Sequence, residues 1–237
     1  MKTFFIKTAA LLWPEVCPFC QKVCRTGICA SCRRMIEKLR VREPRCMQCG
    51  KPLRHMEQEY CHDCMHTHHY YEKGISLWIH RPPVNTSIYQ FKYHNQRRYG
   101  IRYAEEIVKI HGKTILSWDP DLLIPIPLHP KRKRKRGFNQ AEILARELGK
   151  RLSLNVDSIS LIRKLNTDPQ KKLGHAERKN NLKKAFFLQK ELSGVKNVVL
   201  VDDIYTTGNT IDAAAKVLKE GGVEKVYFLT ISIGQGY

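Results

Sequence analysis

The sequence has no long apolar run. No segment approaches the roughly 20 consecutive apolar residues that span a bilayer, so we expect no membrane span. Lys7 interrupts the apolar residues at the N-terminus, and no small-residue cleavage site of the signal-peptide type follows. We therefore expect a short amphipathic helix that Pro14 ends, and a cytoplasmic protein.

Acidic residues are scarce. Asp and Glu number 22 against 42 Lys and Arg, which gives a formal net charge of +20. The cations are clustered, because residues 131–136 are six consecutive basic residues and residues 163–184 are polar and basic, with the character of a mobile loop. A clustered positive surface attracts polyanions such as nucleic acid, and salt weakens that attraction. The alternative for such a run is a solvated surface that serves solubility.

Cysteine is absent beyond Cys64, so no disulfide framework extends over the larger part of the chain. Eight of the nine Cys form CxxC pairs, and two such turns can close one tetrahedral thiolate site. A redox role for CxxC needs a strand–helix context that is missing here. The spacing predicts two structural zinc sites and leaves open whether the pairs interleave. We expect sequential closure, with one site formed by Cys17, Cys20, Cys29 and Cys32 and the other by Cys46, Cys49, Cys61 and Cys64.

The pattern of the chain changes near residue 70. Residues 1–69 hold every Cys and five of the ten His, and their few apolar runs cannot bury a core without metal. Beyond them, strands alternate with helices, which predicts an α/β fold with a doubly wound parallel sheet over residues 70–237. We expect strands at 75–79, 198–201 and 226–231, and residues 122–127 to begin as a buried strand and end in a proline-stiffened loop. We expect helices at 84–92, 99–110, 140–152 and from 211 to 219.

One stretch carries the clearest chemistry. Residues 198–201 read as a buried strand, Asp202 and Asp203 stand where that strand should end, and a hydroxyl-rich turn leads into a helix. The first N–H groups of a helix have no intrahelical partner, so this turn forms an anion pocket. The carboxylates can accept from a ribose diol or hold Mg²⁺ through water. The bland alternative is a strand that ends in a solvated acidic turn. The candidate phosphate-binding residues are Thr206, Thr207, Gly208, Asn209 and Thr210.

This stretch resembles the phosphoribosyl-pyrophosphate (PRPP) loop of the type I phosphoribosyltransferases. The resemblance implies PRPP or ribose 5-phosphate as ligand, Mg²⁺ as its companion, and Asp202 and Asp203 as the candidate catalytic carboxylates. Tyr205 occupies a position that is usually small or aliphatic, where it either covers the ribose or crowds it.

A second loop completes the expected ligand site. Pro125 and Ile126 end a strand on the ligand side of the sheet, where backbone N–H groups could hold pyrophosphate, and Arg136 is the basic residue best placed in sequence to face them. The other cations either close over a diphosphate or grip a DNA backbone. The DNA-binding candidates are Lys131, Arg132, Lys133, Arg134, Arg163, Lys171, Lys172 and Arg178, with Arg33, Arg34, Arg40, Arg42 and Arg45 as a second set.

Further motifs extend the resemblance to nearly the whole chain. They are the CxxC pairs, residues 91–93 (Phe-Lys-Tyr), 125–128, 136–140 (Arg-Gly-Phe-Asn-Gln), and Arg163 with Gln170, Arg178, Asn181 and Phe186. Together they resemble the competence protein F (ComF) family, although residues 94–96 replace its usual Gly-bearing turn. The resemblance implies a zinc finger joined to a phosphoribosyltransferase-like domain. It also implies a role in natural transformation on incoming single-stranded DNA, beside a helicase-like partner.

Three functions remain open at this point. The first is a DNA-handling protein with a PRPP site, in which some of Tyr70, Tyr71, Tyr89, Tyr93 and Tyr99 stack on bases while at least half of them are core or partly buried tyrosines. The second is an active phosphoribosyltransferase, for which no base-specificity element is recognisable. The third is a non-catalytic regulator that senses PRPP.

Overall fold

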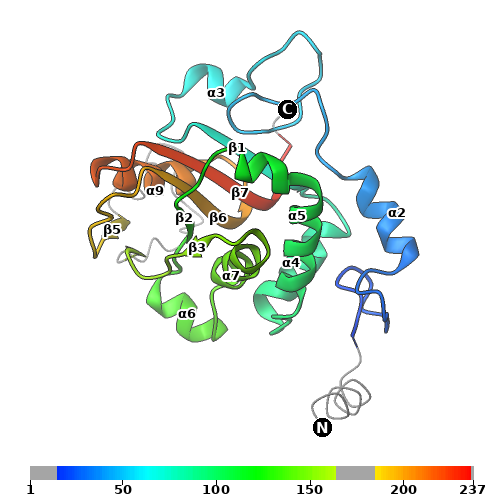
Figure 1. Cartoon of the computed structure of the whole chain (residues 1–237). Coiled ribbons are helices and arrows are strands. Elements are labelled where there is room, and N and C mark those ends of the chain that lie inside the picture. The colour runs from blue at the N-terminus through cyan, green and yellow to red at the C-terminus, as the bar shows by residue number, and fades with distance from the viewer. Residues whose placement is uncertain (1–14, 164–184, 236–237) are drawn as a thin grey trace, which may run out of the picture.

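A computed structural model of the protein describes residues 15–163 and 185–235 (Figure 1). The helix expected over residues 1–14 and the candidates Lys171, Lys172 and Arg178 lie outside these residues. Within the two described ranges, no helix is both long and apolar enough to cross a membrane.

The centre of the molecule is a five-stranded sheet in the order β1-β7-β6-β2-β3, with every neighbouring pair parallel. Its strands are β1 (Lys73–Ile79), β2 (Leu122–Pro125), β3 (Asn155–Val156), β6 (Asn197–Tyr205) and β7 (Lys225–Ile233). A separate antiparallel pair joins β4 (Leu161–Arg163) and β5 (Phe186–Leu188). The parallel sheet that the alternating pattern predicted is therefore confirmed.

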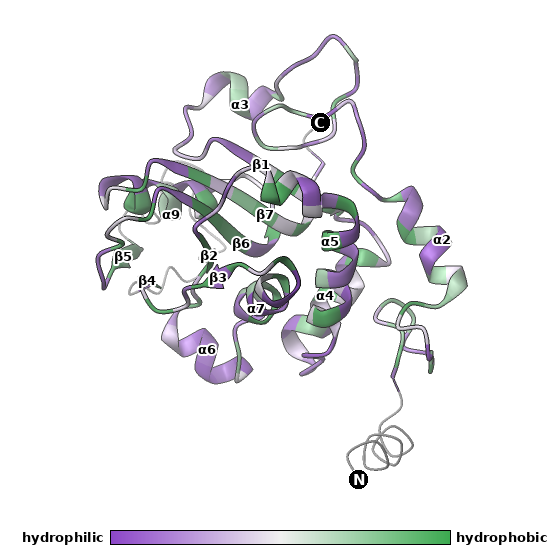
Figure 2. Cartoon of the chain, in the orientation of Figure 1, coloured by the Kyte–Doolittle hydropathy of each residue, from purple (hydrophilic) through white to green (hydrophobic). Residues whose placement is uncertain are grey.

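Helices cover both faces of the sheet, because successive side chains of a buried strand point to opposite faces. Val199 and Val201 pack in one core cluster, and Val198 and Leu200 pack in the other. Both clusters lie along the apolar strands of Figure 2. On one face are α4 (Val84–Tyr93), α5 (Tyr99–Leu116) and α7 (Gln140–Leu152), and on the other is α9 (Asn209–Glu220), as Figure 1 shows.

The strand β6 is longer than the sequence predicted. It continues through Asp202 and Asp203 to Tyr205, because β7 keeps pairing with it, Asp202 opposite Thr230. On its other side β2 ends at Pro125, opposite Val201. The two carboxylates thus lie inside a strand and not at its end, on a part of β6 that has only one neighbouring strand.

The N-terminal module lies against the β1 side of the sheet. It contains α2 (Ala30–Lys38) and α3 (His62–His66). Between them, residues 39–41 run antiparallel to β1: Val41 N–H donates to the Leu77 carbonyl (3.1 Å), and Ile79 N–H donates to the Leu39 carbonyl (2.7 Å). The module therefore lines the outer edge of the sheet.

The basic run forms an ordered helix, α6 (Pro130–Arg136). Six neighbouring cations repel one another, so this helix depends on its ends. The His129 ring accepts from the Lys131 N–H (3.1 Å), Pro130 stands at the first turn, and Gly137 ends the helix with φ +77°.

Candidate functional site

The carboxylates of β6 are met by a lysine from a distant helix. Lys92, in the last turn of α4, places its Nζ 2.7 Å from Oδ1 of Asp203, and only 17% and 13% of the two side chains are exposed. The backbone N–H of Asp203 donates to Oδ1 of Asp202 (2.8 Å). Sequence reasoning treated Lys92 only as part of a motif. Its role depends on α4 packing over the sheet, which local sequence does not report.

The pKa of Asp202 lies far above the usual carboxyl range. Burial raises it, the negative charge of Asp203 raises it further, and Lys92 opposes both, so that the pKa comes to about 7. The coupled pair therefore holds a proton near neutral pH and loses it readily when a cation arrives.

A histidine that sequence reasoning missed stands beside this pair. His80 follows β1 directly, and its Nδ1 lies 2.8 Å from the Ser232 hydroxyl at the end of β7. Burial and then the charge of Lys92 lower the pKa of His80, while Asp203 raises it. The available signal was position alone, since polar residues just beyond the carboxyl ends of parallel strands commonly face the ligand.

The candidate phosphate loop, residues 206–210, joins β6 to α9. Gly208 precedes the helix with φ +78°, and Asp212 N–H makes the first helical bond to its carbonyl (2.8 Å). The N–H groups of residues 209–211 thus stand before the first helical bond, free to bind an anion. The hollow lined by residues 204–211 is about 30 Å³, against roughly 300 Å³ or more for a typical small-molecule pocket. The loop can hold one small group, and the rest of a larger ligand must lie over the sheet edge.

Tyr205 meets neither expectation made for it. Its side chain is buried, its ring stacks on Phe228 (centroids 4.7 Å apart), and its hydroxyl bonds to the Tyr71 hydroxyl (2.7 Å). Burial raises the pKa of both phenols, so both stay protonated. A Cβ on Gly208 would lie 2.5 Å from the Tyr205 hydroxyl. Tyr205 therefore supports the loop of residues 206–210 from the core side, and its buried side chain does not lie on the open side of that loop.

The expected role of Pro125 and Ile126 is wrong in its detail. The Ile126 N–H donates to the Val201 carbonyl (2.9 Å), and Pro125 has no N–H. The first backbone donors of the loop beyond Pro127 belong to Leu128 and His129. Ile126 instead offers its carbonyl to the Asn139 side-chain amide (3.0 Å), which ties the loop to the start of α7.

Arg136 engages α4 and not the loop it was expected to face. Its guanidinium donates to the Tyr93 hydroxyl (2.9 Å) and lies 4.6 Å from the centre of that ring.

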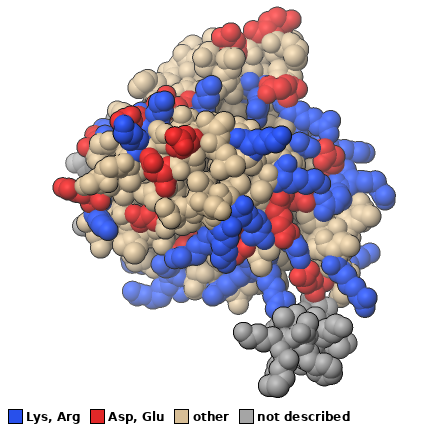
Figure 3. Space-filling view, viewed as in Figure 1, with Lys and Arg blue, Asp and Glu red and all other residues tan. Residues whose placement is uncertain are grey.

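The remaining described candidates of the first DNA-binding set lie on two elements, β4 and α6. Arg163 on β4 is near the carboxylates: burial and the charge of Arg132 lower its pKa, while Asp202 raises it. The side chains of Lys131, Lys133 and Arg134 are exposed on α6. In Figure 3 basic side chains gather along the lower edge, where Figure 1 places this helix.

The eight paired cysteines form two quartets that close sequentially. One contains Cys17, Cys20, Cys29 and Cys32, the other Cys46, Cys49, Cys61 and Cys64, and within each the four sulfurs lie within 4.8 Å of one another. Tetrahedral zinc with Zn–S bonds of about 2.3 Å sets its sulfurs about 3.8 Å apart. The measured contacts, 3.7 Å for Cys20–Cys29 and 3.6 Å for Cys49–Cys61, fit that geometry. Both quartets suit structural zinc and leave no open ligand position.

The second quartet's module touches the first turn of α9. Oδ1 of Asp212 accepts from the Tyr70 N–H (2.7 Å) and lies 3.3 Å from Nδ1 of His69. These contacts occupy the one acidic side chain in the first helical turn, which would otherwise repel an anion at the loop.

Comparisons with known proteins agree with this architecture. The double zinc ribbon domain matches residues 8–65, and the phosphoribosyl transferase domain matches residues 92–232. Competence protein F of Haemophilus influenzae is 31% identical over 210 residues, covering 86% of this chain and 89% of that protein. A DNA utilization protein, YhgH of Salmonella typhimurium, is 30% identical over 220 residues, covering 90% and 94%. Competence protein ComFC of Bacillus subtilis is 28% identical over 205 residues, covering 82% and 79%.

Among solved structures, a purine phosphoribosyltransferase from Pyrococcus horikoshii covers 57% of this chain and 84% of its own, with 13% identity and a TM-score of 0.35, too low to support any argument. The matches to the domains and to the relatives, which extend over most of the chain, are sufficient without it. The chain belongs to the competence protein F family, with an N-terminal double zinc ribbon and a phosphoribosyltransferase domain.

Proposed function

We propose that the protein handles incoming single-stranded DNA in the cytoplasm during natural transformation, and that its sheet domain binds PRPP or ribose 5-phosphate. One observation supports the ligand site: Asp202, Asp203 and Lys92 lie close together at the carboxyl end of β6, just before the candidate phosphate loop. The names of the relatives, competence protein F and DNA utilization protein, support the DNA role. A helicase-like partner, which the family resemblance implies, belongs to the same proposal.

The proposed ligand divides over two elements. The loop of residues 206–210 receives the 5-phosphate at the N-terminus of α9, where the first backbone N–H groups of the helix can donate to it. Asp202 and Asp203 accept from the ribose diol. Mg²⁺ fits the same edge, since it prefers carboxylate and water oxygens and would be held by these two side chains. Bound Mg²⁺ would neutralise a diphosphate, and its arrival favours loss of the proton that Asp202 retains near pH 7.

A second candidate is phosphoribosyl transfer itself. The observation in its favour is that the carboxyl pair contacts Lys92 and is close enough to Arg163 for Asp202 to raise the pKa of that guanidinium, because opposed charges in a partly buried site can stabilise a cationic ribose and an anionic leaving group. Incubation with isotope-labelled PRPP and candidate acceptors tests it: labelled product supports an enzyme, and intact PRPP supports a binder or sensor.

The ligand site is tested by Asp202→Asn combined with Asp203→Asn. Asn keeps the shape of Asp but not its charge, so the variant should fold like the wild type and bind Mg²⁺–PRPP at least a hundredfold more weakly, about 2.7 kcal/mol. Glu220→Gln, an exposed acid at the far end of α9, is the matched control. Calorimetry that finds equal affinity in the double variant and the control would remove the assignment.

The DNA role is tested on the wild-type protein. Anisotropy of labelled single-stranded DNA should show weakly sequence-selective binding whose logarithmic affinity falls linearly with the logarithm of salt concentration, by about 0.7 for each phosphate contacted. Loss of binding even at low salt contradicts a DNA-handling function.

A further inference from the structure

Two large aromatic side chains on α4 face solvent. Tyr89 and Tyr93 are 54% and 53% exposed, and their ring centres are 4.9 Å apart. They stand four residues apart, on one face of the helix. Half-exposed ring pairs of this kind offer flat apolar surface that water solvates poorly and that another flat ring can cover.

Cations border this ring pair. The Arg136 guanidinium lies over the Tyr93 ring and donates to its hydroxyl. Lys92, adjacent in sequence, reaches Asp203. The ring pair therefore contacts the last residue of the basic helix α6, and the residue that precedes Tyr93 in sequence contacts the carboxylate pair.

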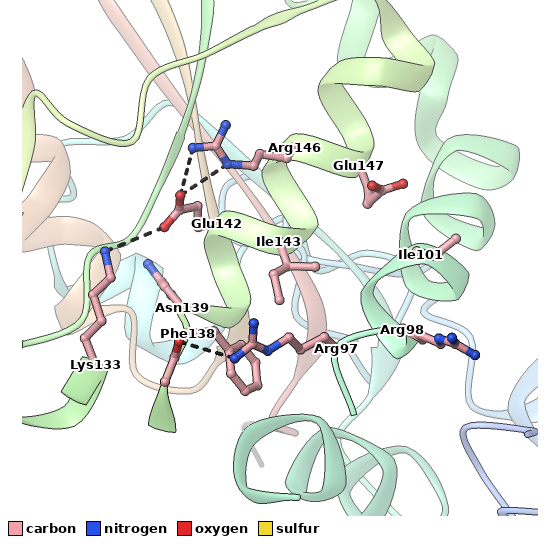
Figure 4. Close-up of a pocket in the computed structure, with 11 residues that line it drawn as sticks. Arg97, Arg98, Ile101, Lys133, Phe138, Asn139, Glu142, Ile143, Arg146 and Glu147 are labelled. Carbon is pink, nitrogen blue, oxygen red and sulfur yellow. Dashed lines mark hydrogen bonds and ion pairs between the residues drawn. The ribbon is translucent and has the colours of Figure 1, made fainter. Parts of the chain in front are cut away.

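A cavity of about 500 Å³ opens beside Gly137 and Phe138, which directly follow Arg136 (Figure 4). Both of these residues line the cavity, and Arg136 contacts Tyr93. Arg97 lies in the same lining, since it donates to the Gly137 carbonyl (3.4 Å) and its guanidinium lies 4.9 Å from the centre of the Phe138 ring. Apolar side chains from α5 and α7 form part of the lining, Ile101 and Ile143 among them.

The rim of the cavity is positive. Its lining includes Arg97, Arg98, Lys133 and Arg146 against two acids, Glu142 and Glu147. Glu142 is matched by Arg146 (2.8 Å) and Lys133 (3.9 Å), as the dashed lines of Figure 4 mark.

The second acid is matched from outside the cavity, by Lys150 (2.8 Å) and Arg151. The two acids therefore leave the cationic rim with a net positive charge. An apolar floor with a cationic rim suits a ligand that joins flat rings to phosphates.

We propose that Tyr89 and Tyr93 stack on bases of single-stranded DNA, while Arg97 and Arg146 at the cavity rim bind its backbone phosphates. Stacking on aromatic rings accepts every base, which suits a protein that must handle any incoming sequence. Duplex DNA cannot use the rings, because its base faces are covered by their neighbours. The inference rests on the proposed DNA function and assigns it a place, beside the ribose-phosphate site.

The test compares four tyrosine variants on two ligands, a fluorescent oligothymidylate and its duplex with oligoadenylate. Tyr89→Ala and Tyr93→Ala should each weaken single-strand binding about tenfold and leave duplex binding and the salt dependence unchanged. Tyr93→Phe keeps the ring and should bind like wild type. Tyr60→Ala removes an exposed tyrosine (41%) of the zinc module and is the control.

A fifth variant tests the phosphate contacts. Arg97→Gln should reduce the slope of logarithmic affinity against logarithmic salt by about 0.7, the value for one phosphate on a single strand. Within the described residues the Arg136 guanidinium contacts Tyr93 and not Tyr89, so Tyr89→Ala decides between the outcomes if Tyr93→Ala disturbs the fold.

The outcomes separate two failures. If the wild type binds the single strand but Tyr89→Ala and Tyr93→Ala bind it as tightly as Tyr60→Ala does, the proposed stacking on Tyr89 and Tyr93 is overturned and the DNA-binding function stands. If wild type binds no single strand, both this inference and the DNA function are overturned. Equal losses of affinity for the single strand and for the duplex would also overturn the proposed stacking, because stacking on exposed bases cannot explain a loss of duplex binding.

Discussion

Replacing Gly208 by Ala tests how tightly the phosphate loop is fitted to the core. Gly208 has φ +78°, and a Cβ there would lie 2.5 Å from the Tyr205 hydroxyl and 3.0 Å from Cζ. Gly194 provides a matched control, since it has the same φ of +78° and its Cβ would meet nothing within 4 Å. Both substitutions place Ala in a left-handed backbone conformation, and only at Gly208 does the new methyl group also collide with the Tyr205 side chain.

The magnitudes follow from that comparison. The left-handed conformation costs Ala about 1–2 kcal/mol, which should appear at both positions. Tyr205 cannot swing aside freely, because it stacks on Phe228 and bonds to Tyr71. Forcing a methyl group into such packing costs a further 1–3 kcal/mol or so. We expect Gly208→Ala to be the more destabilising by that difference, and to weaken Mg²⁺–PRPP binding, because the start of α9 must shift.

Urea unfolding and calorimetry measure both effects. Tyr205→Phe should partly rescue Gly208→Ala by removing the closest atom, and it is best made together with Tyr71→Phe, since a lone buried hydroxyl costs about 1–3 kcal/mol. The coupling in such a cycle should be about 1 kcal/mol. Equal destabilisation by Gly208→Ala and Gly194→Ala, with ligand affinity intact, would refute the fit described here.

Two further predictions concern metal and pH. Elemental analysis should find two zinc ions per chain, and chelation should unfold the N-terminal module while sparing the sheet, since apparent binding energies at such sites reach about 10–16 kcal/mol; one ion or none contradicts the two quartets. The pKa of Asp202 is about 7 in the folded protein, against 3.8 for an ordinary Asp, so the native state binds an extra proton between these two values, and the stability of the fold falls as pH rises from 3.8 to about 7. Asp202→Asn should remove this part of the pH dependence in urea titrations, whereas an unchanged profile would show that the carboxyl ionises normally.

Local sequence predicted the elements that depend on near neighbours. The CxxC spacing predicted two thiolate quartets, because each pair is a single turn, and the sequential closure that we expected but could not derive from the spacing is confirmed. The run from residue 198 predicted strand, turn and helix in the right order, because apolar content and the Gly208 turn are local properties.

The errors came from contacts between distant segments. The carboxylates were placed at a strand end, and pairing with Thr230 on β7 carries the strand past them. We expected the Ile126 N–H to bind a ligand, but it donates to the Val201 carbonyl. We expected Tyr205 to lie at the ribose, but its hydroxyl is hydrogen-bonded to Tyr71 in the core. Lys92 was missed for the same reason. None of these partners is close in sequence, so no local pattern could report them.

The antiparallel contact between residues 39–41 and β1 has a consequence for how the domains can be separated. β1 is an outer strand of the sheet, and unpaired outer strands recruit strands from other molecules. The segment that links the two cysteine quartets occupies that edge through Leu39 and Val41. A sheet domain cut free at residue 70 would expose the backbone of β1 and self-associate. We therefore expect the N-terminal module also to prevent aggregation of the sheet domain through β1.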